Sequence, residues 1–269
     1  MPQASISRPL ALVTGASSGI GAAFARAYAA RGYDLALVAR RKDRLDALGA
    51  ELSDKYGITA QSIAADLSVW EAEKPVLAAL AGRPVDALVN NAGFGVAEDY
   101  LDAPWERHRD GLMTMVVGAC ALAYAVLPGM IAKGRGAIVN VGSMTSFSPG
   151  AAGHTLYPAT KTFALRFSQS LDAELRDKGI AVTCVCPGFT KTEFAEVSGV
   201  AEQMASAPRL FWMTADQVAE AALRGNETGQ VIVVPGWHNK IAALLLRYLP
   251  EPLVRAAIKA GSAKYRPAK

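Results

Sequence analysis

The stretch Thr14-Gly15-Ala16-Ser17-Ser18-Gly19-Ile20-Gly21 directly follows the apolar run Leu10–Val13, and a helical pattern begins near Ala22. Glycines in such a turn permit tight backbone conformations and let a pyrophosphate approach the main chain. The first turn of the following helix offers unpaired N–H groups and a partial positive charge. Strand, turn and helix together predict a dinucleotide-binding site at Gly15, Ser17, Ser18, Gly19, Ile20 and Gly21. The alternative is a turn that is rich in glycine only because it packs closely.

A basic segment ends the second apolar run, where Ala39-Arg40-Arg41-Lys42 follows Leu35–Val38. In the simplest case an acid at this point holds the ribose hydroxyls of NAD, but no acid is present here. Guanidinium groups form strong forked pairs with phosphates, so Arg40 and Arg41 suit the 2′-phosphate of NADP(H). We therefore expect NADP(H) to be preferred over NAD(H). A solvated basic loop is the alternative.

Short apolar runs and helical stretches alternate along the chain. The runs are Leu10–Val13, Leu35–Val38, Ala60–Ala64, Ala87–Val89, Ala137–Val141, Ala181–Val185 and Val231–Val234, and the helical stretches include Gly19–Arg31, Asp43–Tyr56, Trp105–Ala132 and Phe163–Lys178. This alternation predicts an α/β fold of the Rossmann type, a doubly wound parallel seven-stranded sheet with helices on both faces. No linker or repeat interrupts it, so residues 1–269 are expected to form a single domain.

Composition narrows the class of protein. The chain has 269 residues, of which 51% are hydrophobic and 19% charged, and this composition supports a large core. Its three cysteines form no CxxC pair, so neither a disulfide framework nor a metal site is predicted. The first residues do not show the pattern of a signal peptide. We also expect no apolar run close to the roughly 18 residues that span a membrane, so we expect a cytoplasmic protein. The net charge of +4, without a dense basic run early in the chain, does not indicate nucleic-acid binding.

Tyr157 and Lys161 lie four residues apart, so they share one face of a helix. Pro158 lacks an N–H and is tolerated only in a first helical turn, which places Tyr157 near the start of that helix. Ser143 follows the run Ala137–Val141, at the sheet edge where open α/β folds bind ligands. The three residues are candidates for a reacting centre, although Tyr and Lys at this spacing also occur on ordinary helices.

Five motifs occur in one order: Thr14–Gly21, Asn90-Asn91-Ala92-Gly93, Ser143, Tyr157-Pro158-Ala159-Thr160-Lys161 and Pro187-Gly188. The chain thereby resembles the short-chain dehydrogenase/reductase family over roughly residues 8 to 235. The resemblance implies an oxidoreductase that interconverts a carbonyl compound and an alcohol, with Tyr157 as acid and base, Ser143 on the substrate oxygen, and Lys161 binding the ribose and lowering the pKa of Tyr157. It also implies a homodimer or homotetramer.

The same resemblance implies further cofactor contacts. Asp66 and Leu67 would meet the adenine, and Asn91, Ala92 and Gly93 would line the cofactor. Pro187 and Gly188 belong to a loop that touches the cofactor. Thr190 or Thr192 would contact the nicotinamide amide or the phosphates.

One position departs from the family pattern. Many members carry an asparagine on the long helix before the fifth strand, where it holds a water that connects the lysine to solvent. Met115 stands at this position, and no asparagine occurs between Asn91 and Asn140. Thr114 or a backbone carbonyl could hold the water, or proton exchange could be slower. The third possibility is a regulator that binds NADP(H) with little or no turnover.

The substrate is expected to be an apolar carbonyl compound or alcohol. Large side chains that could surround an apolar pocket are Phe94, Phe147, His154, Phe189, Phe211 and Trp212, although each could equally belong to the core. His154, three residues before Tyr157, is either a second acid or a solvated histidine. The segment Phe189–Met213 lies between a cofactor-contacting loop and a new helix, and it is expected to form a mobile lid because its residues 193–207 include few large apolar side chains. Thr214-Ala215-Asp216-Gln217 has the capping-box form that begins a helix, so the far end of the lid is fixed.

The C-terminal segment, residues 236–269, is a basic extension in which seven Lys or Arg residues oppose only Glu251, a formal charge of +6. Ile241, Leu244, Leu245 and Tyr248 recur at helical spacing, and a second apolar set follows Pro250 and Pro252. Two short amphipathic helices are predicted. Their apolar faces could cover the substrate mouth, join a second subunit or lie on an anionic membrane, and we favour packing on the protein itself or on a partner subunit.

Overall fold

The computed structural model describes residues 8–150, 155–199, 201 and 208–256. Seven parallel strands form one sheet in the order β3-β2-β1-β4-β5-β6-β9. Their bounds are β1 Leu10–Thr14, β2 Asp34–Ala39, β3 Ala60–Ala64, β4 Ala87–Asn90, β5 Gly136–Val141, β6 Ile180–Val185 and β9 Ile232–Val233. The chain order reverses direction between β1 and β4, which is where open parallel sheets bind ligands. The predicted fold class is confirmed.

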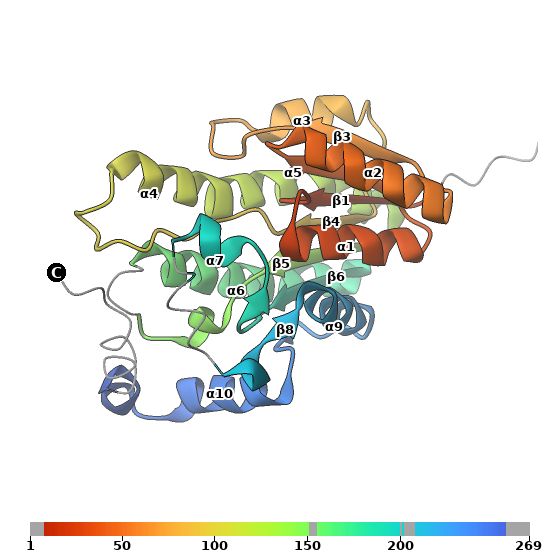
Figure 1. The fold of residues 1–269 in the computed structure, drawn as a ribbon. Helices are drawn as coiled ribbons and strands as arrows, with labels where there is room; N and C mark the ends of the chain where they lie inside the picture. Colours follow the sequence, from red (N-terminus) through yellow and green to blue (C-terminus); the bar gives the residue numbers. More distant parts are fainter. Residues whose placement is uncertain (1–7, 151–154, 200, 202–207, 257–269) are drawn as a thin grey trace, which may run out of the picture.

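Helices cover both faces of the sheet (Figure 1). One core joins the sheet to α1 (Gly19–Ala30), α2 (Lys42–Tyr56) and α9 (Ala215–Glu227). The other joins it to α3 (Glu73–Ala79), α5 (Gly118–Lys133) and α6 (Leu156–Leu175). Because both faces are covered, the central strands are largely apolar, and all five residues of β1 are buried, whereas the edge strand β3 carries polar and exposed residues.

The long helix predicted from Trp105 is continuous but not regular. It consists of α4 (Trp105–Leu112), a π-helical turn η1 (Met113–Val117) and α5. Single π turns inside α-helices are rare and occur often at functional sites. Met115 lies within this turn, at the position where the family pattern has asparagine.

Three local expectations need correction. Helix α6 begins at Leu156 and not at Phe163, because Tyr157 and Pro158 occupy its first turn, as Pro158 independently predicts. Helix α3 was not expected, since its seven residues are too few to show helical periodicity. The segment after β6 contains a small parallel strand pair that was not predicted from the sequence, β7 (Thr190–Lys191) with β8 (Met213–Thr214).

One helix among the described residues, Trp105–Lys133, is long and apolar enough to cross a membrane, with a mean hydropathy of 2.0. This corrects the expectation that no run approaches that length, because residues 111–132 contain no charged side chain. Core helices meet the same criteria. Here α5 contributes Leu122, Ala123, Val126 and Met130 to the core.

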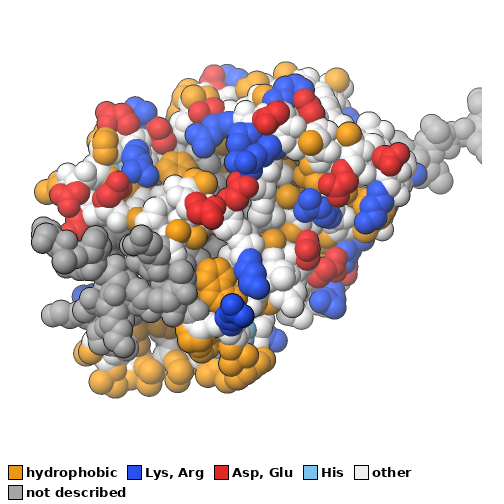
Figure 2. Space-filling view, in the orientation of Figure 1, with side chains coloured by type: hydrophobic (Ala, Val, Ile, Leu, Met, Phe, Trp, Pro, Cys, Tyr) orange, Lys and Arg blue, Asp and Glu red, His pale blue; other side chains and the backbone are white. Residues whose placement is uncertain are grey.

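The C-terminal extension begins with α10 (Trp237–Tyr248), and residues 251–256 form a further helical turn. Helix α10 lies beyond the carboxyl end of the sheet (Figure 1). Apolar side chains gather over it at the lower edge of the molecule in Figure 2. Those with large exposed areas are Trp237, Ile241, Leu244, Leu245, Tyr248 and Leu249. Ala257 and Ile258, which complete the second predicted apolar set, lie outside the described residues.

Candidate functional site

A cavity of about 1320 Å³ opens at the carboxyl ends of the strands. Pockets for a single small ligand usually measure roughly 300–1,000 Å³, so this cavity has room for a dinucleotide and a substrate together. Residues from the glycine turn, from the ends of β2 and β5, from the segment that follows β4, and from α6, α7 (Phe194–Val197) and α10 all line it. The sequence-predicted residues that line it are Gly15, Ser17, Ser18, Gly19, Ile20, Arg40, Arg41, Asp66, Leu67, Asn91, Ala92, Gly93, Ser143, Tyr157, Lys161, Pro187, Gly188, Thr190 and Thr192.

The glycine turn has the backbone geometry of an anion site. Gly15 and Gly19 have φ of 64° and 55°, in the left-handed region that glycine adopts without steric cost. Helix α1 begins at Gly19 without a side-chain cap and without an acid in its first turn. Its first N–H groups therefore face the cavity, where a pyrophosphate would satisfy them.

Gly21 differs in placement from the rest of the turn, because it is not among the residues that line the cavity. A Cβ atom on Gly21 would lie 2.2 Å from the carbonyl oxygen of Gly15 and 2.6 Å from Nδ2 of Asn91. Its function is therefore to let α1 pack under the turn, and any cofactor contact through it is indirect.

Asn91 and Thr14 fasten the turn to the neighbouring strand. Nδ2 of Asn91 donates to the carbonyls of Thr14 and Gly15, at 2.9 and 3.3 Å. Oγ1 of Thr14 donates to the carbonyl of Val89 and accepts from the backbone N–H groups of Asn91 and Ala92. Since Thr14 is buried, these bonds are shielded from water and hold the turn in one conformation.

The basic residues at the end of β2 lie at the far end of the cavity from the reacting centre. Arg40 is exposed and acts electrostatically on Asp66, whose carboxylate accepts from the N–H and the hydroxyl of Ser68. Burial raises the pKa of Asp66, but the Ser68 bonds and Arg40 outweigh it, so the pKa falls below its ordinary value. Arg41 donates to the hydroxyls of Ser17 and Ser18.

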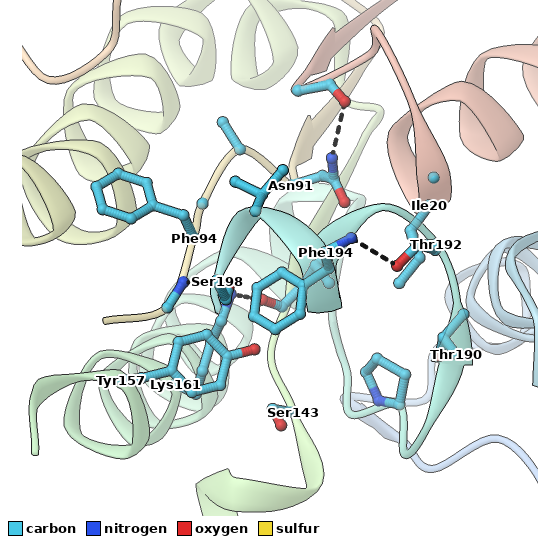
Figure 3. Close-up of a pocket in the computed structure, with 18 of the residues that line it drawn as sticks. Ile20, Asn91, Phe94, Ser143, Tyr157, Lys161, Thr190, Thr192, Phe194 and Ser198 are labelled. Carbon is cyan, nitrogen blue, oxygen red and sulfur yellow. Dashed lines mark hydrogen bonds between the residues drawn. The ribbon is translucent and has the colours of Figure 1, made fainter. Parts of the chain in front are cut away.

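Ser143, Tyr157 and Lys161 come together at the other end of the cavity (Figure 3). The side chains of Tyr157 and Ser143 point toward the same space in this view. Nζ of Lys161 lies 5.5 Å from the centroid of the Tyr157 ring and donates to the carbonyl of Val141 at 2.8 Å. Oγ of Ser143 accepts from the N–H of Thr145 at 3.1 Å, so the serine hydroxyl proton is directed elsewhere.

The electrostatics of this pair differ from the expectation. Burial raises the pKa of Tyr157 above its ordinary value, and the Ser143 hydroxyl acts in the opposite sense. Lys161 is not among the causes of this shift, and burial lowers the pKa of Lys161 itself to about 8. The expected lowering of the tyrosine pKa by the lysine is therefore not found in the protein alone, and Tyr157 is a protonated phenol near neutral pH.

Behind Lys161 lies a second, small cavity of about 20 Å³, lined partly by Thr114, Met115 and Lys161. Sδ of Met115 lies 3.8 Å from Oγ1 of Thr160, and its side chain fills the space beside Gly93. Oδ1 of Asn90 also borders this cavity, is buried and has no hydrogen-bond partner among the described residues. The cavity is large enough for one water molecule and offers polar partners for it.

Only part of the predicted apolar set lines the main cavity. Phe94, Phe189 and Phe211 do so. Phe147 instead packs against the core cluster of Leu165, Cys184 and Cys186, and Trp212 stacks near Phe189 at 5.7 Å. His154 lies outside the described residues.

Several lining residues escaped the sequence reasoning. Phe194 packs on Tyr157 with ring centroids 5.5 Å apart, and Oγ of Ser198 accepts from the N–H of Gly95. Thr145 lines the cavity beside Ser143, and its buried Oγ1 has no partner within the described part of the chain. Helix α10 contributes His238, Asn239, Ala242 and Leu246. For these four α10 residues the sequence offered one signal, the amphipathic pattern of the helix, and this pattern does not indicate which surface the helix packs against.

The fit of a nicotinamide dinucleotide can be judged from this geometry. The cavity joins an anion-binding turn, a basic adenosine end and a Ser–Tyr–Lys centre in one continuous space. These residues fit the cofactor. Within residues 8–150, 155–199, 201 and 208–256, no group of three His, Cys, Asp or Glu side chains could hold a metal ion.

Comparisons with known proteins identify the family. Residues 9–203 match the family model described as short chain dehydrogenase. An oxidoreductase of Myxococcus xanthus, described as uncharacterized, is 35% identical over 258 residues, which cover 95% of this chain and 98% of that protein. A short-chain dehydrogenase from Sphingobium yanoikuyae, solved in complex with NADPH, is 35% identical with a TM-score of 0.80 and covers 97% of both chains.

A second solved structure is the bulky-bulky ketone specific alcohol dehydrogenase from Comamonas testosteroni. It is 31% identical with a TM-score of 0.75 and covers 98% of this chain and 97% of that chain. The seven-stranded parallel sheet with helices on both faces agrees with these matches. The chain belongs to the short-chain dehydrogenase/reductase family of NAD(P)-dependent oxidoreductases.

Proposed function

We propose that the protein interconverts a bulky apolar carbonyl compound and its alcohol, using NADP(H) with Tyr157 as the acid and base. The observation that carries this proposal is that Tyr157 and Ser143 face the same space in a cavity that the glycine turn also lines. A regulator that only binds nucleotide would not need this arrangement.

The cofactor would lie along the cavity from Arg41 to Tyr157. The first turn of α1 would hold the pyrophosphate, and Asp66 and Leu67 would meet the adenine. Arg40 and Arg41 supply positive charge for the 2′-phosphate, which supports a preference for NADP(H). The NADPH in the Sphingobium yanoikuyae structure is consistent with this preference.

The proton chemistry follows from the pKa directions. A general acid must be protonated at the working pH and within reach of the oxygen that it protonates. The raised pKa of Tyr157 keeps its phenol protonated, so it can donate to a carbonyl oxygen. The Ser143 hydroxyl, whose oxygen already accepts from Thr145, can donate to the same oxygen. When bound, the reduced nicotinamide would supply the hydride.

We also propose that the small cavity behind Lys161 carries the proton route that an asparagine provides in other members. Thr114 lines both cavities, and Asn90 offers an unpaired acceptor. A water held there would connect the lysine, beside Thr114, to the main cavity and its solvent without an asparagine at position 115. Replacing Thr114 by valine should slow turnover by about tenfold, because an isosteric side chain without a hydroxyl cannot hold the water. Unchanged turnover would contradict this route.

The substrate class rests on the walls beside Tyr157. Phe94, Phe194, Phe211 and Leu246 present apolar surface there, and they suit an apolar group on each side of the carbonyl carbon. The ketone specificity in the name of the Comamonas testosteroni relative points in the same direction.

The test is NADPH consumption on a panel of aryl and alkyl ketones, repeated with Tyr157→Phe. Loss of a general acid costs roughly 10²- to 10⁴-fold, so kcat/KM should fall by that factor while NADPH binding stays within about threefold. Tyr124→Phe is the matched control, since Tyr124 is 83% exposed on α5. Activity that survives in Tyr157→Phe would exclude the proposed acid.

We propose a cytoplasmic homodimer or homotetramer in which the exposed face of α10 meets a partner subunit. The inner face of α10 lines the cavity, so its outer apolar residues need another cover. Light scattering should give a smaller particle, or an insoluble one, after truncation behind Gly236. Sedimentation of the full chain with anionic vesicles at physiological salt, lost on truncation, would favour a membrane instead.

A further inference from the structure

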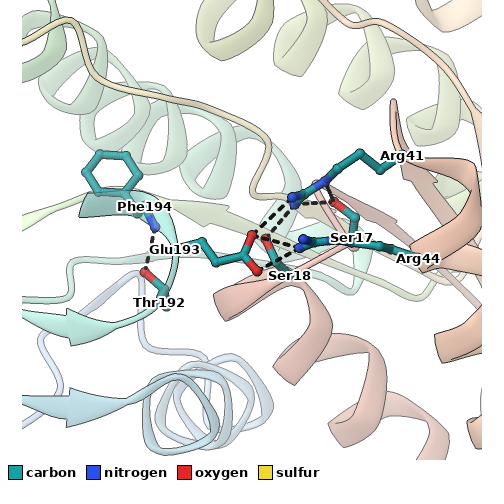
Figure 4. Close-up of polar contacts among 7 residues, drawn as sticks. All are labelled: Ser17, Ser18, Arg41, Arg44, Thr192, Glu193 and Phe194. Atoms are coloured by element: carbon teal, nitrogen blue, oxygen red, sulfur yellow. Dashed lines mark hydrogen bonds and ion pairs between the residues drawn. The ribbon is translucent and has the colours of Figure 1, made fainter. Parts of the chain in front are cut away.

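Glu193 sits between two arginines at the adenosine end of the cavity (Figure 4). Its Oε2 lies 3.0 Å from Nη1 of Arg41. Nη1 of Arg44 donates to both carboxylate oxygens, at 2.6 and 2.8 Å. Glu193 and Arg41 both line the cavity. A carboxylate of the protein itself therefore pairs with the arginine that follows β2 and with the arginine in the first turn of α2.

The remaining donors of Arg41 are also engaged. Nε and Nη2 donate to the hydroxyl of Ser17, and Nη2 also donates to Ser18, at 3.0 to 3.3 Å. These hydroxyls are neutral and can rotate to accept or donate. The carboxylate of Glu193 is the negative partner of the guanidinium.

A carboxylate and a phosphate monoester are bound by guanidinium groups in the same way, through parallel N–H bonds. They cannot share these donors without repulsion, because the phosphate carries a charge between about −1.5 and −2. All three side chains are 40–43% exposed, and ion pairs of this kind are weak. The carboxylate can therefore be exchanged for a phosphate at little cost.

Glu193 is also connected to the reacting centre. The preceding residue, Thr192, accepts from the N–H of Phe194 through Oγ1 and lies against Gly19. Phe194 packs on the ring of Tyr157. Movement of Glu193 away from the arginines would therefore shift the adjacent residue, Phe194, whose side chain contacts the proposed acid, Tyr157.

We propose that Glu193 is an internal anion that holds the 2′-phosphate site through Arg41 and Arg44 until NADP(H) displaces it. Glu193 thereby determines how strongly the protein distinguishes NADP(H) from NAD(H), and Arg44 is a third phosphate-binding residue beside Arg40 and Arg41. The inference rests on the proposed use of NADP(H). NAD(H), which has no 2′-phosphate, leaves the carboxylate in place.

Fluorescence titration of NADPH and NADH onto the full chain tests this. Glu193→Gln should bind NADPH about three- to tenfold more tightly, because one competing charge is removed, while NADH affinity changes by less than about twofold. Glu196→Gln is the matched control, since Glu196 makes the same charge change on the exposed side of α7. Adenosine 2′,5′-bisphosphate against adenosine 5′-phosphate repeats the comparison without a nicotinamide.

Arg44→Ala supplies the second arm. It should weaken NADPH binding by about fivefold and should remove most of the gain from Glu193→Gln in the double variant, because both act on one site. Hydrogen exchange at Phe194–Val197 should respond to NADPH in the wild type but not in Glu193→Gln.

The outcomes separate the two levels of the argument. NADPH affinity that is unchanged or weakened in Glu193→Gln would overturn the role of Glu193 and leave the NADP(H) proposal intact. Wild-type protein that binds NADH as tightly as NADPH, or binds neither, would overturn both. A gain for NADPH in Glu196→Gln as large as in Glu193→Gln would show a general charge effect and would also overturn the inference.

Discussion

The two walls of the cavity are held by different kinds of interaction. The turn between β1 and α1 is fixed by buried hydrogen bonds from Thr14 and Asn91 and by the close approach of Gly21 to Gly15. The opposite wall is built from the described residues 190–199 and 208–213 and from α10. It is held by an exposed ion-pair cluster at Glu193, ring contacts and the side-chain bonds of Ser198 and Asn239.

The difference follows from what each wall must bind. A pyrophosphate is recognised by backbone N–H groups, which only a rigid turn can aim. A substrate is recognised by side-chain shape, and a wall built from side-chain contacts can change without disturbing the sheet. We therefore expect changes in the turn to affect stability and binding together, and changes in the second wall to affect binding with little effect on stability.

The largest effect is expected for Gly21→Ala. The added methyl group would meet the Gly15 carbonyl at 2.2 Å, so the free energy of unfolding should fall by about 2–4 kcal/mol, and NADPH binding should be lost with it. Thermal and urea unfolding measure the loss of stability, and fluorescence titration measures the loss of NADPH binding.

Gly129→Ala, inside α5, is the matched control. Its methyl group would meet only Pro84, at 3.8 Å, so it should stabilise the protein by about 0.5–1 kcal/mol. Equal losses at Gly21 and Gly129 would show that the turn is not specially constrained.

Arg41→Ala should weaken NADPH binding by about tenfold and NADH binding by less than about threefold, because a charge-assisted phosphate contact is lost. Arg40→Ala, at an exposed position, should have the smaller effect of the two. Melting temperatures should remain within a few degrees of the wild type. An unchanged preference between the two nucleotides in both variants would refute the charge argument for NADP(H).

Lys161→Met should make the protein more stable at pH 7 while abolishing activity. Burial lowers the pKa of Lys161 from 10.5 to about 8, so the folded state carries the cost of a buried ammonium below pH 8. Between pH 8 and 10.5 the unfolded state binds the extra proton, and wild-type stability therefore rises with pH in that window. The advantage of the variant, about 1–2 kcal/mol at pH 7, should shrink across it.

Urea unfolding at pH 7, 9 and 10.5 measures this difference. Lys178→Met, at an exposed position, should show no such dependence. An advantage of Lys161→Met that grew with pH would have the wrong sign for a buried ammonium.

The smallest effect concerns dynamics. Amides at 189–199 and 208–213 should exchange faster than those of α1 in the free protein and should slow when NADPH binds, if this segment closes over the site. Residues 200 and 202–207 of the expected lid lie outside the described residues. Slow exchange throughout, with and without NADPH, would refute a lid and would remove the contrast between the two walls.

The sequence by itself determined the features that rest on local chemistry. Apolar runs alternating with helical patterns gave the parallel sheet, because both faces of each strand must be buried. The glycines after β1 indicated a tight turn, which Gly15 and Gly19 make with positive φ angles, and Pro158 indicated a helix start beside Tyr157. The order of Ser143, Tyr157 and Lys161 along the chain was enough to place them at one edge of the sheet.

Only the tertiary structure decided the features that depend on residues far apart. Glu193 meets Arg44 across 149 positions, and Arg44 could have been suspected only from its place one helical turn beyond Arg40 and Arg41. No pattern in α10 says that one of its faces closes the cavity. The charge of Lys161 was expected to lower the pKa of Tyr157, yet burial is the largest influence on the pKa of both groups. Contacts and burial arise only when the chain has folded, because they depend on which surfaces meet and on how much water they exclude.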